Sequence, residues 1–278
     1  MKQQTLAQAI EYSGIGLHSG QPVNLRLVPA PQDSGIVFKR TDLPEQPTIR
    51  ALPELVTSTV RATTLSEHGA EVFTVEHLLA ALSMMQVDNC LVEMSSPEPP
   101  VADGSAAVYV DLIQQAGLAK QAAERRVYAL DRSFSVYKDD IYLIALPYDG
   151  YRISFTSINP HPLLGTQYFD IDLDKDEVLQ EIAPARTVAF EEEIAYMQKH
   201  GLGLGGTLEN VVVFGQDKIL SVPRFADELI RHKILDVIGD LYLLGSIKAH
   251  IIAMKSGHAF NSNLSKQIQA YRLKGEQQ

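Results

Sequence analysis

The chain has 278 residues, 45% of them hydrophobic and 21% charged, a composition typical of a folded globular protein. Its formal net charge is −10 and no cluster of Lys and Arg stands out, so a nucleic-acid partner is not expected. The single cysteine, Cys90, excludes an intramolecular disulfide and a zinc site built from thiolates. The N-terminus lacks the apolar stretch of a signal peptide, and no segment has the roughly 20 apolar residues that cross a bilayer, so we expect a cytoplasmic protein.

The first half of the chain combines strand-like and helix-like patterns. Alternating apolar residues predict strands, and apolar residues at helical spacing predict helices. The expected elements are strands at 21–30, 35–40 and 89–96 and helices at 75–85 and 106–117, with a glycine-rich turn at 14–20. The polar, alanine-rich segment 118–126 is the expected linker to the second half.

The second half begins a similar pattern again. Its expected elements are strands at 140–147, 151–158, 211–214 and 249–255 and helices at 191–200, 226–244 and 262–272. Both halves contain a helix, a strand, a Gly-x-Ala tripeptide and a second helix, in that order. This repeat predicts an α+β fold of two similar domains, at 1–122 and 127–278, each a β-sheet layered with two α-helices. Two such domains facing each other would bring His77 and His232 to one cleft.

One predicted helix carries charge on an apolar background. Within 231–240, the side chains of His232, Asp236 and Asp240 fall on one narrow stripe, opposite an apolar face. His232 and Asp236 are four residues apart and could chelate one metal ion, although such a pair alone is more often a local hydrogen bond. The apolar surroundings favour the metal, because a carboxylate there needs a partner.

A third ligand is available from Glu76 and His77, which adjoin at the start of an apolar helix. Neighbouring side chains diverge by about 100°, so one of the two could bind the metal while the other faces a water molecule. Two histidines and one aspartate leave the fourth position of tetrahedral zinc open for water, as a catalytic site requires. Alternatively, Glu76 only stabilises the N-terminus of its helix through the dipole.

His258 follows a glycine turn between a strand and a helix. Paired with the carboxylate of Asp240, its imidazole would stay cationic and could stabilise charge or protonate a leaving amine. The alternative is a polar residue that lies near a helix start without any role in chemistry.

The segment 201–206, GLGLGG, matches the pattern G-x-G-x-x-G. It follows a helical segment and precedes a strand, which is the reverse of the order in a dinucleotide-binding motif. We therefore interpret it as a glycine-rich turn and expect no NAD.

Seven segments taken together resemble the UDP-3-O-acyl-N-acetylglucosamine deacetylase family, the zinc amidases of bacterial lipid A synthesis. They run in the family's order, and they are GIGLHSG (14–20), TVEHLLAAL (74–82), DGSAA (103–107), ARTVAF (185–190), GLGLGG (201–206), RHKILDVIGDLYLLG (231–245) and KSGHAFN (255–261). Each segment alone is weakly specific, but the joint match extends over almost the whole chain.

The resemblance implies an active site at the interface of the two domains. One Zn²⁺ per chain would be held by His77, His232 and Asp236, with Glu76 as the general base that acts on water. Val188 departs from the family, which often has Phe at this position, so the aromatic contact to the sugar would be missing.

The resemblance also implies roles for five further polar residues. His258 would be the cationic catalytic histidine, and Asp240 would orient it. The hydroxyl of Thr187 would bind the oxyanion. Lys233 would contact the sugar and Lys255 the UDP phosphates, which explains how an acidic protein could hold a dianionic nucleotide.

In this family, a βαβ insert in the second domain shapes a hydrophobic passage for the fatty chain of the substrate. The corresponding segment here is 188–215, and Ile194, Met197 and Leu202 are the candidate lining residues. Their alternative interpretation is the inner face of an amphipathic helix.

The sequence therefore predicts hydrolysis of the N-acetyl amide of a UDP-linked, 3-O-acylated glucosamine, as a step of lipid A biosynthesis. The expected partner is this substrate, and the protein would be a monomer that contacts the inner membrane surface transiently. The alternatives are a zinc amidohydrolase with another substrate and a catalytically inactive sugar-nucleotide binding module. The presence of Glu76, Asp236 and His258 speaks against the inactive module.

Overall fold

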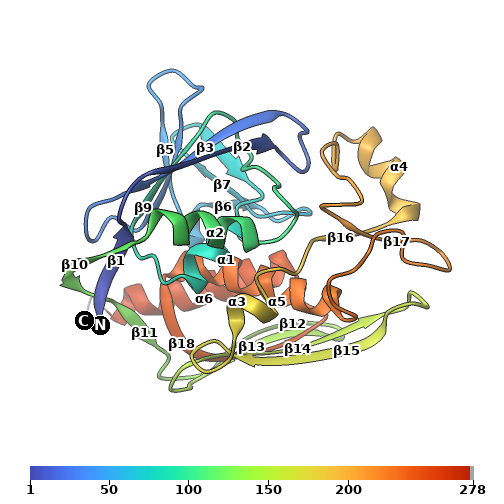
Figure 1. Ribbon diagram of the computed structural model, residues 1–278. Helices are drawn as coiled ribbons and strands as arrows, with labels where there is room; N and C mark the ends of the chain where they lie inside the picture. Colours follow the sequence, from blue (N-terminus) through green and yellow to red (C-terminus); the bar gives the residue numbers. More distant parts are fainter. Residues whose placement is uncertain (276–278) are drawn as a thin grey trace.

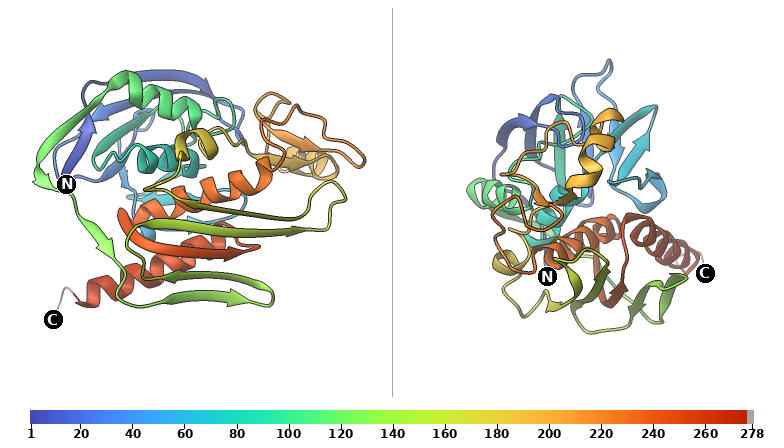
Figure 2. Two further views of the ribbon diagram at one scale, coloured as in Figure 1. Left: turned by 60° about the horizontal axis from the view of Figure 1, so that its bottom comes forward. Right: turned by 90° about the vertical axis from the view of Figure 1, so that its right-hand side faces the viewer.

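The computed structural model describes residues 1–275 and has the α+β architecture expected from the sequence. Its layers run sheet, helices, helices, sheet, so that the helices of the two halves face each other in the middle of the molecule (Figure 1; Figure 2, right). None of the helices in residues 1–275 is both long enough and apolar enough to cross a membrane.

The first half contains a five-stranded sheet covered by two helices. Along β3 (Pro22–Pro29), every second side chain from Val23 to Leu27 is buried, which explains why this alternating segment forms a strand with one face towards the core. In sheet order, the strands are β2 (Ile10–Ile15), β3, β9 (Cys90–Met94), β4 (Ile36–Arg40) and β5 (Thr48–Arg50). The helices are α1 (Glu76–Met84) and α2 (Ala107–Ala116), and a small second sheet is formed by β6 (Val56–Ser58), β7 (Thr64–Glu67) and β8 (Ala70–Phe73) after the 3₁₀ turn η1 (Pro53–Leu55).

The second half repeats this arrangement. In sheet order, its main strands are β12 (Phe134–Lys138), β13 (Ile141–Leu146), β18 (Ser246–Met254), β14 (Tyr151–Asn159) and β15 (Gly165–Asp172), and β11 (Val127–Ala129) also pairs with β18. The helices of this half are α3 (Val178–Glu181), α5 (Glu228–Leu241), which continues into the 3₁₀ turn η2 (Tyr242–Leu244), and α6 (His258–Gly275).

The two sheets share one topology. In each, the strand between the two long helices is central, pairs antiparallel with one neighbour and pairs parallel with the other: β9 with β3 and β4, and β18 with β13 and β14. The internal repeat predicted from the sequence is therefore present in the strand order. The division into domains at 122 and 127 stays a prediction, and strand pairing changes from β1 to β18 between residues 124 and 127.

The segment 118–126, expected as the linker, is largely a β-strand. Residues Leu118–Glu124 form the strand β10, which pairs antiparallel with β1 (Lys2–Leu6). In β10 every second side chain is exposed, so the polar, alanine-rich composition indicates a surface strand rather than a loop.

A βαβ unit projects from one end of the molecule (Figure 1, right). Its strands β16 (Val188–Phe190) and β17 (Val212–Phe214) pair in parallel, and α4 (Glu191–Lys199) lies between them in the sequence. No residue of α4 is buried, so this helix contributes little to the core. The glycine-rich segment 201–206 forms a turn after α4, as expected.

The helices α1 and α5 cross in the centre of the molecule at very short range. Gly239 of α5 faces the backbone of Glu76, and a Cβ atom at position 239 would lie 2.0 Å from the Glu76 carbonyl oxygen. The largest core cluster extends through both halves around this crossing, from Leu25 and Phe38 to Ile251 and Leu264. Glycine at position 239 therefore sets the distance between the two halves.

We predict that Gly239→Ala destabilises the fold by about 1–3 kcal/mol, because the added methyl group has to push two packed helices apart. Urea denaturation followed by circular dichroism would measure the loss. The control is Gly275→Ala in α6, where a Cβ atom would meet nothing within 4 Å, and it should change stability by less than about 0.5 kcal/mol. Superimposable denaturation curves for Gly239→Ala and the wild type would contradict this account of the crossing.

Candidate active site

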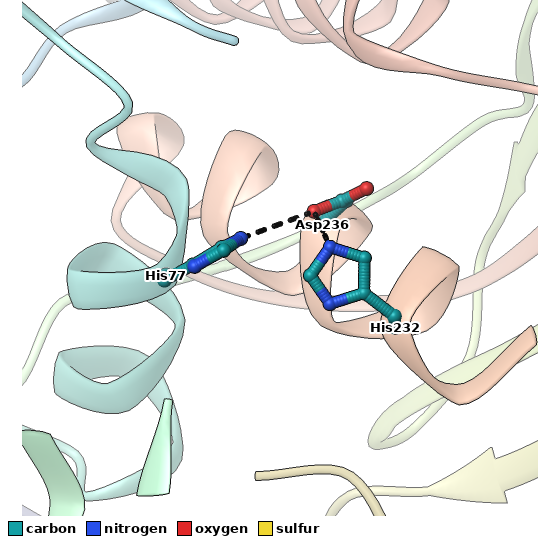
Figure 3. Close-up of side chains that lie close together, drawn as sticks. All are labelled: His77, His232 and Asp236. Carbon is teal, nitrogen blue, oxygen red and sulfur yellow. Dashed lines mark ion pairs between the residues drawn. The ribbon is translucent and has the colours of Figure 1, made fainter. Parts of the chain in front are cut away.

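The α1–α5 crossing brings two histidines and an aspartate together. His77 comes from the first turn of α1, and His232 and Asp236 come from successive turns of α5 (Figure 3). One ligand atom from each residue lies within 4.8 Å of the others, and all three residues are buried. The Oδ1 atom of Asp236 is 3.4 Å from His232 Nε2 and 3.9 Å from His77 Nε2. Ligand atoms of a tetrahedral zinc site are separated by about 3.3 Å, so the set is close to metal-binding geometry.

The protonation states of this cluster also suit a metal. Burial lowers the pKa of His77 to about 3, and burial likewise lowers the pKa of His232, so both imidazoles are neutral near pH 7. His232 Nδ1 lies 3.1 Å from the carbonyl oxygen of Ala185. Because a carbonyl only accepts, Nδ1 carries the proton and the Nε2 lone pair is left for a metal ion.

Asp236 completes the donor set as a carboxylate. Burial alone would raise its pKa, but the ammonium of Lys233 and the cationic imidazole of His258 outweigh burial and hold the pKa well below its usual range. Lys233 Nζ donates a hydrogen bond to Oδ2 of Asp236 at 2.8 Å, which leaves Oδ1 facing the two histidines. Two neutral imidazoles and one ionised carboxylate therefore fit a divalent ion such as Zn²⁺.

Glu76 is buried next to this cluster, with only 2% of its surface exposed. Burial raises the pKa of its carboxyl group to about 7, and one hydrogen bond, from the backbone N–H of Thr63 at 3.0 Å, partly offsets this effect. A carboxyl group with a pKa near 7 is well matched to general-base chemistry at neutral pH.

His258 forms the second titratable centre of the site. It begins α6, and its Nδ1 lies 2.8 Å from Oδ2 of Asp240. Burial alone would lower the pKa of His258, but the carboxylates of Asp240 and Asp236 outweigh burial and raise it to about 10. His258 is therefore a cation at neutral pH.

Thr63 connects the two centres and was missed in the sequence. Its backbone N–H binds Glu76, and its hydroxyl donates to Oδ1 of Asp240 at 2.6 Å. Asn261 donates to Oδ2 of Asp240 at 2.8 Å, so this carboxylate accepts hydrogen bonds on both oxygens. No local pattern could have singled out Thr63, because Asp240 is 177 positions away in the sequence.

These groups open onto one cavity of about 540 Å³. With the exception of Asp240, which lies behind His258, every site residue predicted from the sequence lines this cavity: Glu76, His77, Thr187, Ile194, Met197, Leu202, His232, Lys233, Asp236, Lys255 and His258. His18, Arg61 and Phe155 also line it and were not predicted. The structure therefore brings the predicted residues together around a single space.

The lining of the cavity departs from the family pattern at Val188. Val188 begins β16 and lines the cavity. Phe190, two positions later, also lines the cavity and has an aromatic ring. Lys255 also lines the cavity, but its ammonium is paired with the exposed carboxylate of Asp140 at 2.6 Å. A phosphate that binds Lys255 would have to compete with this surface ion pair.

Residues 3–270 match the model of the LpxC family, described as UDP-3-O-acyl N-acetylglycosamine deacetylase. The chain belongs to this family. Its relatives named UDP-3-O-acyl-N-acetylglucosamine deacetylase include a protein of Chromobacterium violaceum, 41% identical over 96% of this chain and 90% of the relative. Another, from Marinobacter nauticus, is 41% identical over 97% of this chain and 90% of the relative. A third, from Anaeromyxobacter sp., is 44% identical over 96% of this chain and 88% of the relative. The family expectation from the seven segments is thereby confirmed.

We predict that His232→Ala lowers the affinity for a divalent metal by at least about tenfold, because it removes one of three ligands. Metal per chain, measured by plasma mass spectrometry after equilibration with a weak chelator, would report the loss. The matched control is His250→Ala, because His250 lies on β18 and bonds to Ser154 outside the cluster. Equal metal content in His232→Ala and His250→Ala would remove the proposed metal site.

Proposed function

We propose that this protein hydrolyses the N-acetyl amide of UDP-3-O-acyl-N-acetylglucosamine. The products are acetate and UDP-3-O-acylglucosamine, and the reaction serves lipid A biosynthesis. The observation that carries the proposal is the meeting of a His₂Asp donor set, a carboxyl group of raised pKa and a cationic imidazole in one cavity. The names of the family relatives supply the substrate.

The proposed cofactor is one Zn²⁺ ion per chain, held by His77, His232 and Asp236. The three residues suit zinc because they offer two neutral nitrogen donors and one carboxylate at nearly tetrahedral spacing. When bound, the ion supplies Lewis acidity that polarises the acetyl carbonyl and acidifies the attacking water.

Two side chains transfer protons, and a third stabilises the negative charge that develops on the acetyl oxygen. Glu76 accepts the proton of the attacking water, since its pKa of about 7 allows it to take and hold a proton. His258, kept cationic by Asp240, gives its proton to the departing amine nitrogen. Thr187 is fixed by its backbone, which bonds to Gly104 and Val212, and its hydroxyl is proposed to donate to the developing oxyanion.

The remaining predicted residues are proposed to bind substrate. Lys233 would contact the sugar from its place beside Asp236, and Lys255 would contact the phosphates. Ile194 and Met197 are three residues apart on α4 and both line the cavity, as does Leu202 after the helix, so together they would form the wall of an acyl passage.

Further proposals concern the molecule as a whole. We propose domains at 1–122 and 127–278, with the site between them and an insert at 188–215. We also propose a cytoplasmic monomer that takes up its acylated substrate by transient contact with the inner membrane surface. The alternative of an inactive sugar-nucleotide binding module is disfavoured. An inactive protein would be expected to lose Glu76, Asp236 or His258 first, and all three are present and bonded to neighbouring groups.

We predict that purified, zinc-loaded protein releases acetate from UDP-3-O-acyl-N-acetylglucosamine. Replacing Glu76 by Gln should lower kcat by about 10²–10⁴-fold, because the amide cannot accept the proton from water. Acetate release would be followed by a coupled assay, and metal content would be measured on the same samples. If fully zinc-loaded wild-type protein leaves the substrate intact, the proposed function is wrong.

We further predict that kcat/KM falls at high pH as His258 loses its proton, with an apparent pKa of about 10. Asp240 raises that pKa, so Asp240→Asn should lower it and move the basic limb of the profile by at least about one unit towards neutral pH. Rates measured between pH 6 and 11 would locate the limb. A limb that stays in place in Asp240→Asn would contradict the pairing of the two residues in catalysis.

A further inference from the structure

One buried carboxylate of the molecule takes no part in the chemistry described above. Glu98, in the loop after β9, is 0% exposed, and no ion pair is found for it within residues 1–275. It accepts four hydrogen bonds instead. The donors are the backbone N–H of His18 (2.8 Å), the backbone N–H and hydroxyl of Ser19 (2.8 and 2.6 Å) and the hydroxyl of Thr74 (3.0 Å). Burial of a carboxylate costs free energy, and hydrogen bonds from neutral donors are what offsets the cost here. Each donor is in turn held by a bond to a charged acceptor.

The donors of Glu98 belong to two segments that border the cavity. His18 and Ser19 lie in the turn after β2. Thr74 lies two residues before Glu76, the first residue of α1, which His77 follows. Gly16 lies directly against this carboxylate, because a Cβ atom at position 16 would lie 2.2 Å from Oε2 of Glu98 and would displace it. Glu98 therefore fixes the turn against the beginning of the catalytic helix.

The same turn holds the glycine-rich segment of the insert. Three consecutive backbone N–H groups, those of Gly203, Leu204 and Gly205, donate to His18 Nδ1 (3.3 Å), His18 O (3.2 Å) and Leu17 O (2.9 Å). A Cβ atom at Gly205 would lie 2.2 Å from the carbonyl oxygen of Gly16, so the two backbones touch. We name the contact between residues 16–19 and 203–205 the glycine seam.

The glycine seam is a major attachment of one cavity wall. The helix α4 has no buried residue, and its ion pair to the body of the protein, Glu193 with Arg61, is between partly exposed side chains. Leu17 also belongs to a small apolar cluster with Val101, Val211 and Val213, which joins the turn to β17. Leu202, beside the seam, lines the cavity.

We propose that Glu98 is a positioning residue for acyl-chain recognition: it fixes the turn 16–19, and through the glycine seam it fixes the wall of the acyl passage relative to α1. This inference rests on the proposed function, because it concerns the acyl chain of that substrate. It assigns a role to both glycine-rich motifs, GIGLHSG and GLGLGG, which form the two sides of one backbone contact.

The test compares two substrates that differ only in the acyl chain, UDP-3-O-acyl-N-acetylglucosamine and UDP-N-acetylglucosamine. In Glu98→Gln, which loses one acceptor and keeps the shape, kcat/KM for the acylated substrate should fall about tenfold, mainly through KM. The value for the unacylated substrate should stay within about twofold of wild type. Glu71→Gln, on the exposed face of β8, is the control and should change neither value.

A second variant acts on the other side of the seam. Gly205→Ala leaves Glu98 and its donors intact, but the new methyl group should displace residues 203–205 and produce the same loss of acyl selectivity. It keeps the test decisive if Glu98→Gln folds poorly.

Hydrogen exchange supplies a readout that does not depend on activity. The amides of residues 203–205 should exchange at least about tenfold faster in both variants than in the wild type, with metal content unchanged. Unchanged exchange, or an equal loss of kcat/KM for both substrates, would overturn the inference. If the wild-type protein deacetylates neither substrate, the proposed function fails instead, and exchange still decides whether Glu98 holds the seam.

Discussion

The contact between Gly239 of α5 and the carbonyl of Glu76 in α1 is the constraint on which the site depends. Each helix alone offers an incomplete set of ligands: His77 on one, His232 and Asp236 on the other. Their atoms reach metal-binding distance only because the backbones approach without an intervening side chain. Since tetrahedral coordination tolerates shifts of only a few tenths of an ångström, the packing of the two halves and the chemistry of the site cannot vary independently.

Burial acts on two neighbouring carboxyl groups in different ways because their partners differ. Asp236 has an ammonium within hydrogen-bond distance and stays ionised, whereas Glu76 has a single backbone N–H and a pKa near 7. Asp240 is surrounded by donors, and its charge in turn keeps His258 protonated. The number and charge of the groups in contact with each carboxylate thus maintain a base, Glu76, and an acid, His258, side by side at one pH.

Part of the fold could be predicted from the sequence, since periodicity identified the long helices and the three inner strands of each main sheet. The outer strands β2, β5, β12 and β15 were not predicted. The repeat of helix, strand and helix predicted that the two halves are similar, as their common strand order shows. The residues around the cavity were predicted from the polar stripe of one helix, at 231–240, and from the seven segments that resemble the family. The failures have physical reasons. The strand β10 was interpreted as a linker because its outward face is polar, and Thr63 and Glu98 were overlooked because their partners lie far away in the sequence or belong to the backbone.

The βαβ insert differs from the rest of the molecule in how it is stabilised. Its helix α4 buries no residue, and its apolar contacts form a small cluster separate from the main core. Regions with few buried contacts open at a lower free energy than the core around them. The cavity wall formed by the insert should therefore open at a lower free energy than the wall formed by α1 and α5, which carries His77, His232 and Asp236. A long, flexible ligand can thus be admitted or released by a local fluctuation that leaves the metal-binding geometry undisturbed.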